Sequence, residues 1–392
     1  MTVTLPAITR GLDLTEDQTM IRDMVREFAL AEVAPQAHEI DEEHRFPKET
    51  WDKIVELGLT GICFPEELGG AGGDTLSYIL AVEELSKVCG STGLTLAAHV
   101  SLGTYPIYRW GGEKLCNEYV PRLIAGEYMG AYGLTEPGAG SDSGGTLTTA
   151  VLDGDEYILN GRKCFITNAN YSGVFVCTAV TDKSMGPKGI SAFVVPRNID
   201  GFSLEKGERK LGMRGSDWAS LVFEDARIPK DHLLGPEGEG FKTFMQTLEG
   251  GRISIAALAL GIAEGAFAEC ARYASEREAF GGTLSDQQAV QFKLADMATQ
   301  IQCSKHLVYD AARLKDAGKT YGTEASMAKL HASEVAMKVT YDAIQILGGF
   351  GYSREYPVER MWRDAKLCTI GEGTSEVQRI IIGRSVLQNL PT

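Results

Sequence analysis

A glutamate between two glycines is the residue of this sequence best suited to act as a base. Glu372 lies between Gly371 and Gly373, close to the end of a long helical region. Because glycines permit a sharp bend, we expect the carboxylate to point away from the helices and to reach a ligand. A solvated loop glutamate is the simpler interpretation, and this short segment does not decide between the two.

A second glycine-rich segment lies far upstream, at residues 132–142, with the sequence Tyr-Gly-Leu-Thr-Glu-Pro-Gly-Ala-Gly-Ser-Asp. It could be a polar loop that leads into a strand. Its backbone N–H groups, together with the hydroxyls of Thr135 and Ser141, could instead bind a flat heteroaromatic ring or a phosphate.

Two shorter segments allow the same pair of interpretations. Arg277, at the start of residues 277–281, is either a surface cation or a ligand contact. Gly348-Gly349, near the end of residues 345–349, is either a helix C-cap or part of a ligand-binding loop.

Motifs that would indicate other chemistry are missing from the sequence. There is no Gly-x-Gly-x-x-Gly after a strand and no Gly-x-x-x-x-Gly-Lys-Ser/Thr. No His-Glu-x-x-His occurs and the six histidines are dispersed, so we predict no metal site. Asp142 stands where a nucleophile elbow needs serine, which leaves a serine hydrolase unsupported.

Charge and composition argue against several classes of partner. The formal net charge of −15 repels nucleic acid and anionic membranes, although a local basic patch could still bind a phosphate. No run of 18 apolar residues exists, so we expect no membrane span. The N-terminal residues resemble no targeting signal. The eight cysteines are scattered without a Cys-x-x-Cys, which indicates buried free thiols in a reducing, cytoplasmic setting.

The residue pattern changes twice along the chain and predicts a multidomain α+β protein. We expect an N-terminal helical domain at 1–130, a middle β domain at 131–235 and a C-terminal helical bundle at 236–392. Short strands separated by Gly, Pro and Asp turns suggest a small antiparallel barrel or sandwich in the middle. Long helices with short connections predict an antiparallel bundle at the end.

Several local features are predicted within these domains. A capping box at Thr15 opens a helix that closes near Pro35 and carries on one face Met20, Ile21, Met24, Val25 and Phe28. Asn160-Gly161 between β-rich runs predicts a hairpin turn. Residues 69–73 predict a flexible connector. A helix at 325–347 repeats at helical spacing Ala332, Val335, Ala336, Val339, Ala343 and Ile346.

In combination and in order, these motifs resemble the acyl-CoA dehydrogenase family. The matching segments are 132–142, 165–167, 277–281, 345–349, 363–366 and 372–379, and the resemblance spans nearly the whole chain. It implies an N-terminal helical domain, a middle antiparallel β-barrel or sandwich and a C-terminal four-helix bundle. It also implies an FAD between the last two domains, and a homotetramer in which the adenine end of FAD reaches a neighbouring subunit.

The resemblance assigns roles to individual positions. The positions that match the family's flavin contacts are Leu134, Thr135, Ser141, Phe165, Thr167, Phe280, Thr374 and Glu376. Four further positions would contact FAD across the subunit interface, namely Arg277, Gln288, Gln345 and Gly349. The positions that match substrate contacts are Ser141, Glu249, Arg252, Gly373 and Arg384.

The implied activity is FAD-dependent α,β-dehydrogenation of an acyl-CoA thioester to the 2-enoyl-CoA, as in fatty acid metabolism. Glu372 would abstract the α-proton while a hydride passes to flavin N5, and its backbone N–H would help to hold the enolate oxygen. An electron-transfer flavoprotein would then accept the electrons. The alternatives on this fold are an enoyl-CoA reductase, a flavin monooxygenase and a scaffold without activity.

Three glycines depart from common versions of the family pattern. Gly371 replaces a frequent tyrosine before the base, which gives a roomier or more mobile site. Gly251 stands where some branched- and long-chain members carry their base, so the proposed base has no rival. Gly93 aligns with an arginine of glutaryl-CoA members, which disfavours a dicarboxylyl substrate. We therefore expect a short, branched or cyclic acyl group in a pocket lined partly by residues 94–102, where His99 either meets the acyl group or is structural.

Overall fold

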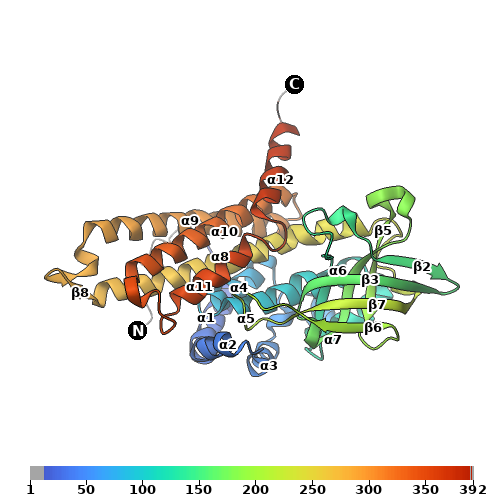
Figure 1. Cartoon of the computed structure of the whole chain (residues 1–392), viewed down its shortest axis with the longest axis horizontal. Helices are drawn as coiled ribbons and strands as arrows, with labels where there is room; N and C mark the ends of the chain where they lie inside the picture. The colour runs from blue at the N-terminus through green and yellow to red at the C-terminus, as the bar shows by residue number, and fades with distance from the viewer. Residues whose placement is uncertain (1–12, 389, 391–392) are drawn as a thin grey trace.

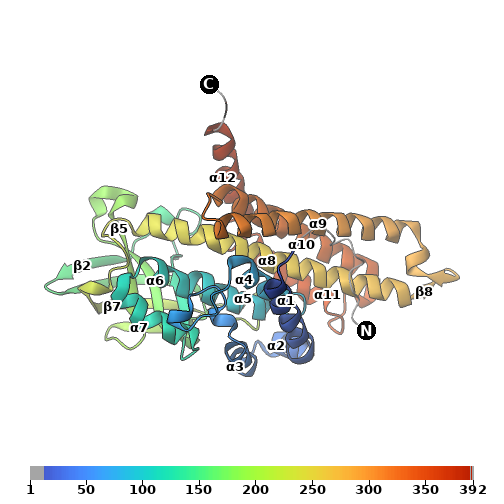
Figure 2. The same ribbon diagram turned by 180° about the vertical axis from the view of Figure 1, so that it is seen from behind.

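The chain folds into a helical N-terminal part, a β-rich middle part and a helical C-terminal part (Figures 1 and 2). The computed structural model describes residues 13–388 and residue 390. The N-terminal part contains α1 (Glu16–Phe28), α2 (Ala37–Glu43), α3 (Lys48–Glu56), α4 (Thr75–Ser86), α5 (Gly90–Ala98), α6 (Tyr105–Trp110) and α7 (Gly112–Ile124). The middle part contains β1 (Met129–Gly133), β2 (Thr149–Asp153), β3 (Glu156–Thr167), β4 (Ser172–Val180), β5 (Ile190–Pro196), β6 (Phe202–Lys206) and β7 (Trp218–Pro229). The C-terminal part contains α8 (Gly240–Glu276), β8 (Glu278–Ala279), β9 (Gly282–Thr283), α9 (Gln288–Asp316), α10 (Gly322–Leu347), α11 (Val358–Cys368) and α12 (Ser375–Gln388).

The first helix begins as predicted, with the capping box of Thr15 and Gln18 in place. Its buried face differs from the prediction, because Met20 is 65% exposed and Met24 is 37% exposed. The side chains that α1 buries are those of Gln18, Val25 and Phe28. The two methionines lie beside this face rather than on it, since α1 packs mainly on one neighbour, α4.

We predicted that the first helix closes near Pro35, but helical structure continues through this residue. A π turn (Ala29–Val33) and a 3-10 turn (Ala34–Gln36) carry it directly into α2. Pro35 lies at the start of this second turn, where its missing N–H breaks no helical hydrogen bond.

The glycine-rich connector at 69–73 is an ordered loop rather than a flexible one. Four of its backbone N–H groups donate to carbonyl oxygens of residues 61–65. A Cβ on Gly70 would overlap the backbone of Phe64, so the glycine permits a close approach of two chain segments.

The middle part is a seven-stranded sheet with the strand order β1-β4-β2-β3-β7-β6, and β5 pairs with β4. The sheet is mixed rather than wholly antiparallel as expected, because β4 runs parallel to both β1 and β2. The remaining pairs are antiparallel. Its core is a separate apolar cluster that includes Tyr157, Phe175, Phe193 and Phe223.

The hairpin predicted at Asn160-Gly161 is not formed there, because β3 runs straight through both residues. Gly161 has φ of 148° beside an irregularity in the pairing with β7, and the Asn160 side chain donates to Asp225 Oδ1 on β7 at 2.9 Å. The turn between β2 and β3 is at Gly154-Asp155, where Gly154 has φ of 63°. Gly154-Asp155 and Asn160-Gly161 could each form a turn, and the chain turns at the first because the second lies in the strand that pairs with β7.

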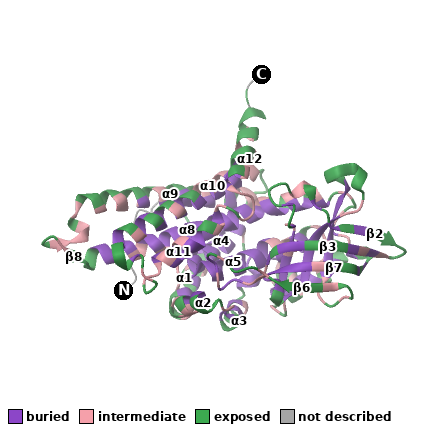
Figure 3. Cartoon of the chain, viewed as in Figure 1, coloured by how far each residue is buried: buried purple, intermediate pink, exposed green. Residues whose placement is uncertain are grey.

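Helices α8 to α11 form the predicted four-helix bundle, and α12 projects from it (Figure 1). The six residues of α10 predicted to share an apolar face are all buried. Burial is densest where α8 contacts α4, α5 and α10 (Figure 3). Among the described residues α8 is the one helix long and apolar enough to cross a membrane, but 83% of its most apolar window is buried inside the protein. It is therefore the central core helix.

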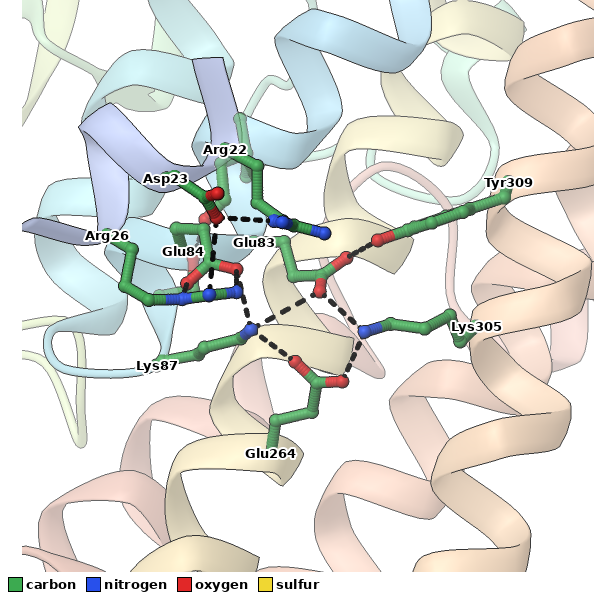
Figure 4. A network of polar contacts seen from close by, with 11 residues as sticks. Arg22, Asp23, Arg26, Glu83, Glu84, Lys87, Glu264, Lys305 and Tyr309 are labelled. Atoms are coloured by element: carbon green, nitrogen blue, oxygen red, sulfur yellow. Dashed lines mark hydrogen bonds and ion pairs between the residues drawn. The ribbon is translucent and has the colours of Figure 1, made fainter. Parts of the chain in front are cut away.

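A buried network of charges joins the N-terminal part to the bundle (Figure 4). Lys305 on α9 ion-pairs with Glu264 on α8 at 2.6 Å and with Glu83 on α4 at 3.0 Å. Lys87, directly after α4, pairs with Glu264 at 2.8 Å and with Glu84 at 2.8 Å. All three carboxylates are at most 2% exposed. Because an unpaired charge is costly at such depth, the network fixes how α4, α8 and α9 meet.

Candidate active site

Glu372 lies on a strained bend between α11 and α12. Its φ of 53° is in the left-handed region, which residues other than glycine rarely adopt, and Gly373 follows with φ of 91°. The bend turns the carboxylate back over α8, so the prediction that it points away from the helices is wrong. A Cβ on Gly251 would overlap Glu372 Oε2 and would lie 3.2 Å from Leu102 Cδ2. The carboxylate is thus seated against the bare backbone of Gly251.

The position of the base depends on the bend, and not on Gly371. Gly371 has no positive φ, and its N–H donates to Leu367 O at 2.8 Å. A Cβ there would meet Leu367 at ordinary contact distances of 3.6 Å and more. The backbone at this position therefore does not require glycine, and the roomier or more mobile site stays a prediction.

Burial raises the pKa of Glu372 to about 7, although the cations Lys329 and Arg252 oppose the shift. Its Oε2 atom is buried, and among the described residues it has no hydrogen-bond partner. A carboxylate that titrates near neutral pH and has an unsatisfied oxygen is poised to take a proton from a ligand.

Hydrogen bonds hold the bend from two sides. The buried Lys329 ammonium donates to Gly373 O at 2.6 Å, and Gln378 Nε2 donates to Gly373 O at 2.9 Å and to Glu372 O at 3.3 Å. Thr374 Oγ1 accepts from the Val377 N–H at 3.3 Å at the start of α12. The N–H of Glu372 donates to no group among the described residues, so it is available to a ligand oxygen.

Arg252 and Glu249 lie next to this bend on α8. Arg252 is 6% exposed and donates to Ser326 Oγ at 3.4 Å, while its Nε is buried without a partner within the described chain. Burial raises the pKa of Glu249, and Arg252 opposes that shift. Three predicted substrate positions, Glu249, Arg252 and Gly373, are therefore gathered around the base. Arg384 and Ser141 are exposed, on α12 and on the loop after β1.

The predicted flavin positions of the middle part gather at the ends of β1 and β3. Leu134 and Thr135 follow β1, and the Cys164 N–H donates to Thr135 O at 2.9 Å. Phe165 has φ of 60°, is 50% exposed and lies on Trp218 with ring centroids 5.0 Å apart. We call Phe165 and Trp218 the aromatic shelf. The hydroxyls of Thr135 and Thr167 make no hydrogen bond within the described residues, so both are free for a ligand.

A buried ion pair lies beneath the loop that follows β1. Lys163 Nζ is 2.7 Å from Glu136 Oε1 and 3.4 Å from Leu134 O. Although burial opposes it, Lys163 and hydrogen bonds from residues 146–148 lower the pKa of Glu136 to about 2. The loop is also closed on itself, because Glu136 and Ala139 exchange N–H···O bonds of 3.1 Å. These two N–H groups are consequently not part of the predicted anion nest.

Strand β1 brings the middle part to the base. The Tyr132 ring stacks on Phe244 of α8 with centroids 4.2 Å apart, and its hydroxyl donates to Phe244 O at 3.0 Å. Burial, followed by the negative charge of Glu372, raises the pKa of Tyr132. This contact joins the end of β1, which leads into the predicted flavin loop, to the part of α8 that also carries Gly251.

The remaining flavin positions lie at the other end of the bundle. Arg277 follows the last residue of α8, and its guanidinium carbon is 5.8 Å from the Phe350 ring beside Gly349. At about 1.5 Å per residue, Arg277 is about 37 Å along the helix from Arg252. Phe280, on the hairpin of β8 and β9, is 91% exposed, and Gln288 and Gln345 are exposed. One copy of the chain does not bring these residues to the shelf (Figure 1).

Two positions considered for the acyl pocket are structural. His99 is fully buried, with Nε2 3.2 Å from Leu123 O, and its Nδ1 accepts from the Gly130 N–H at 3.2 Å. Burial lowers the pKa of His99 to about 4, so the ring is neutral and is held away from the base. A Cβ on Gly93 would overlap Ser86 Oγ, so this position has no room for a side chain.

The sequence did not lead us to predict Lys329 or Trp218 as site residues. It also did not predict that Tyr132 contacts α8. A signal existed for Lys329, because it lies on the apolar face of α10 between Ala325, Ala328 and Ala332. A charged side chain is almost never fully buried unless it has a partner, so a lysine on such a face predicts a specific contact. Trp218 carried no comparable signal, since its contact with Phe165 depends on the pairing of β3 with β7.

The chain thus combines a helical, a β-rich and a second helical part, with a buried, unpartnered carboxylate oxygen of Glu372 against α8. The chain matches three family models: "Acyl-CoA dehydrogenase, N-terminal domain" at 15–127, "middle domain" at 131–226 and "C-terminal domain" at 238–387. It belongs to the acyl-CoA dehydrogenase family.

Individual relatives are similar over almost their full length. The short-chain specific acyl-CoA dehydrogenase of Clostridium acetobutylicum is 53% identical over 376 residues, which are 96% of this chain and 99% of that protein. The structure of butyryl-CoA dehydrogenase from Megasphaera elsdenii has a TM-score of 0.95 and 45% identity, covering 96% of this chain and all of that one. A chain solved in work on the electron transferring flavoprotein of Acidaminococcus fermentans has a TM-score of 0.95 and 53% identity, covering 97% and 100%.

Proposed function

We propose that Glu372 is the base with which this protein dehydrogenates a short-chain acyl-CoA at Cα–Cβ. Dehydrogenation of an acyl-CoA by an FAD-dependent enzyme is the function that the family membership and the named relatives support. The observation that carries the role of Glu372 is its seat on Gly251, with a buried, unpartnered oxygen and a pKa of about 7. No other carboxylate among the described residues combines these features at this end of α8.

The residues of the middle part suit FAD. The aromatic shelf offers a flat apolar surface, and the free hydroxyls of Thr135 and Thr167 supply hydrogen-bond donors beside it. The left-handed backbone of Phe165 is strain of the kind that persists at ligand sites. When bound there, FAD supplies the hydride acceptor for the Cβ hydrogen.

The chemistry assigned to the chain is removal of the α-proton. Ionised Glu372 takes the proton from Cα, and the electrons of that C–H bond become the new Cα–Cβ double bond as the hydride leaves Cβ. The free N–H of Glu372 donates to the thioester oxygen, where negative charge develops in the transition state. One such donor lowers the barrier by roughly 3 kcal/mol. Leu102 lies beside Gly251 and thus adds an apolar group next to the carboxylate.

The contacts of Glu249 and Arg252 support a CoA thioester as the substrate. Arg252 offers an unpaired buried Nε, and Glu249 lies three residues before it on the same face of α8. A short acyl group is supported by the names of the relatives in Clostridium acetobutylicum and Megasphaera elsdenii. One relative is named for the reverse direction, the acryloyl-CoA reductase (NADH) of Anaerotignum propionicum at 47% identity, but the relatives named as dehydrogenases favour the forward reaction. None of these relatives is named as a monooxygenase.

We also propose how the protein assembles, which protein accepts its electrons and where in the cell it works. A homotetramer is supported by the 37 Å or so between Arg252 and Arg277, since only another copy can bring Arg277, Gln288, Gln345 and Gly349 to the shelf. An electron-transfer flavoprotein as acceptor is supported by the chain solved in work on such a protein. Eight free cysteines support a reducing, cytoplasmic setting, and the substrate class supports a role in fatty acid metabolism.

The variant Glu372→Gln tests the assignment of the base. It should keep yellow FAD and bind CoA thioesters, because size and shape are retained, but should reduce its flavin about 10²- to 10⁴-fold more slowly. Anaerobic mixing with butyryl-CoA, followed by flavin absorbance, measures the rate. Glu376→Gln, an exposed glutamate on α12, tests the neighbouring predicted flavin position in parallel. Near-normal reduction by Glu372→Gln would overturn the assignment.

A further inference from the structure

Lys329 is an unusual lysine in this structure. Three lysines are buried among the described residues, namely Lys163, Lys305 and Lys329. Lys163 ion-pairs with Glu136, and Lys305 pairs with Glu83 and Glu264. Lys329 is 0% exposed and, within the described chain, has no carboxylate at ion-pair distance. A buried ammonium without a counterion is costly and calls for a compensating group.

The group that Lys329 contacts is the bend of the base. Its ammonium donates to Gly373 O at 2.6 Å, one residue beyond Glu372. Glu372 and Glu376 are the carboxylates that act on it electrostatically, and Glu376 is exposed at the start of α12. Glu372, whose Oε2 atom is buried, is therefore the less exposed of the two acids that act on this cation.

We propose that Lys329 is a positioning residue for Glu372: it holds the bend through the Gly373 carbonyl, and its positive charge favours the ionised form of the base. This inference rests on the proposed role of Glu372. Lys329 touches no reacting atom, and it acts through the loop and through its charge.

The other groups around Glu372 cannot replace this charge. Arg252 on α8 is the second cation there, but it lies beside Glu249, which partly neutralises it. Burial raises the pKa of Tyr132 on β1, of Tyr78 on α4 and of Cys368 on α11, the last to about 12, so all three are neutral. Neither cation forms an ion pair within the described residues, but Lys329 on α10 donates a hydrogen bond to the bend itself, whereas Arg252 donates to Ser326.

The order in which the two groups titrate suits this role. Burial lowers the pKa of Lys329 to about 8, and burial raises that of Glu372 to about 7. Between these values the ammonium is charged while the carboxylate is ionised. Removing the ammonium should therefore raise the pKa of Glu372 further and leave less of the base ionised at pH 7.

The test compares Lys329→Met with Lys329→Arg and Gln378→Met in the FAD-loaded enzyme. Gln378→Met removes hydrogen bonds to the same bend without changing any charge, so it separates anchoring from electrostatics. The readout is the rate of flavin reduction by butyryl-CoA against pH, with flavin content measured for each variant. Lys319→Met, at an exposed lysine on the loop after α9, is the control for loss of a lysine charge elsewhere.

We expect Lys329→Met to keep its flavin and to move the acid limb of the rate profile upward by about one pH unit, as expected for loss of one nearby opposite charge. The rate at pH 7 then falls about fivefold, because the ionised fraction of Glu372 falls from about one half to about one tenth. Lys329→Arg should restore the acid limb. Gln378→Met should slow flavin reduction at all pH values and leave the pH of the acid limb unchanged.

The proposal is overturned if the limb of Lys329→Met coincides with that of the wild type, or if Gln378→Met moves it equally. Lys329→Gln carries the same test if Lys329→Met does not fold, because it also removes the charge. Glu372→Gln is measured alongside. If Glu372→Gln reduces its flavin at a normal rate, Glu372 is not the base and the proposed role of Lys329 is refuted with it. If Glu372→Gln is inactive but the acid limb of the rate profile is unchanged in Lys329→Met, only the role of Lys329 is refuted.

Discussion

At the scale of single residues, the site is marked by backbone strain. Seven described residues other than glycine have positive φ, and three of them are predicted site residues: Phe165, Phe280 and Glu372. Such conformations cost roughly 1–3 kcal/mol each and persist where the surroundings impose them. At Glu372 the surroundings are the hydrogen bonds from Lys329 and Gln378, which hold the bend while the carboxylate itself stays free.

The pKa of Glu372 predicts how the reaction depends on pH. The base must be ionised, and burial raises its pKa to about 7, so kcat/KM should rise as pH increases toward 7 and level off above it. A solvated glutamate would place the same limb near pH 4.3. Steady-state assays with butyryl-CoA and a dye acceptor between pH 5 and 9 measure the limb. A flat profile down to pH 5 would contradict the buried base.

The seat of the base predicts that Gly251 tolerates no side chain. In Gly251→Ala the new methyl group would overlap Glu372 Oε2, so the carboxylate must shift. Misplacing a catalytic group by about 1 Å costs about 100-fold in rate, and we expect a loss of kcat of that size with FAD retained. Gly383→Ala, where a Cβ meets nothing within 4 Å, is the matched control and should be neutral. Equal activities of the two variants would show that the seat is unimportant.

At the scale of elements, the ends of β1 and β3 are held by a buried ion pair. Lys163 on β3 reaches Glu136 and Leu134 O, so it ties the loop after β1 to the strand that carries Phe165. The Glu136 carboxylate accepts from the N–H groups of Leu147 and Thr148 as well. One pair of charges therefore positions both halves of the proposed flavin site.

Breaking this pair should loosen the flavin. Lys163→Met leaves Glu136 buried without its cation, which destabilises a protein by about 3–5 kcal/mol. We expect lower urea resistance and purification with little FAD. In the double variant with Glu136→Leu no charge is left unpaired, so stability should partly return while flavin binding stays weak. Urea titration and flavin-to-protein absorbance ratios measure both effects, and unchanged FAD content in Lys163→Met would contradict the role of the pair.

At the scale of the whole molecule, α8 separates two groups of proposed flavin residues. Arg252, beside Glu372, lies in its first half, and Arg277 lies directly after its end, about 37 Å from Arg252 along the helix. Phe280 is 91% exposed and Tyr352 is 89% exposed at that far end, and α12 projects from the body (Figures 1 and 3). In the homotetramer that we propose, another copy would cover these exposed aromatic residues.

The variant Phe280→Asp should weaken both assembly and FAD binding. A charge at this exposed apolar position opposes burial against a partner, so we expect smaller species in light scattering and a Kd for FAD at least about tenfold higher, which corresponds to ~1.4 kcal/mol. Met185→Asp, at an exposed loop position of the middle part, should change neither. Tetramers with normal FAD affinity in Phe280→Asp would contradict binding across an interface.

What could be predicted from the sequence was what depends on near neighbours in the chain. The capping box at Thr15 and the buried face of α10 follow from spacings of three and four residues. The ordered motifs also allowed Glu372, Arg252 and the three-part α–β–α layout to be named. The prediction of a hairpin at Asn160-Gly161 was wrong because these residues pair with another strand, β7, within β3. The prediction that Met20 and Met24 lie on the buried face was wrong because the position of α4 decides which face of α1 is buried.

The tertiary structure alone decided how the site works. It seats Glu372 on Gly251, 121 positions earlier in the sequence, and brings Lys329 to the carbonyl of Gly373. It turns His99 to backbone groups and places Arg277 far from the shelf. These outcomes depend on which helices meet and at what distance, and they set burial, charge and therefore the pKa of the base. Residue types and their order allowed Glu372 to be predicted as the base, but only packing determines the proton affinity of its carboxylate.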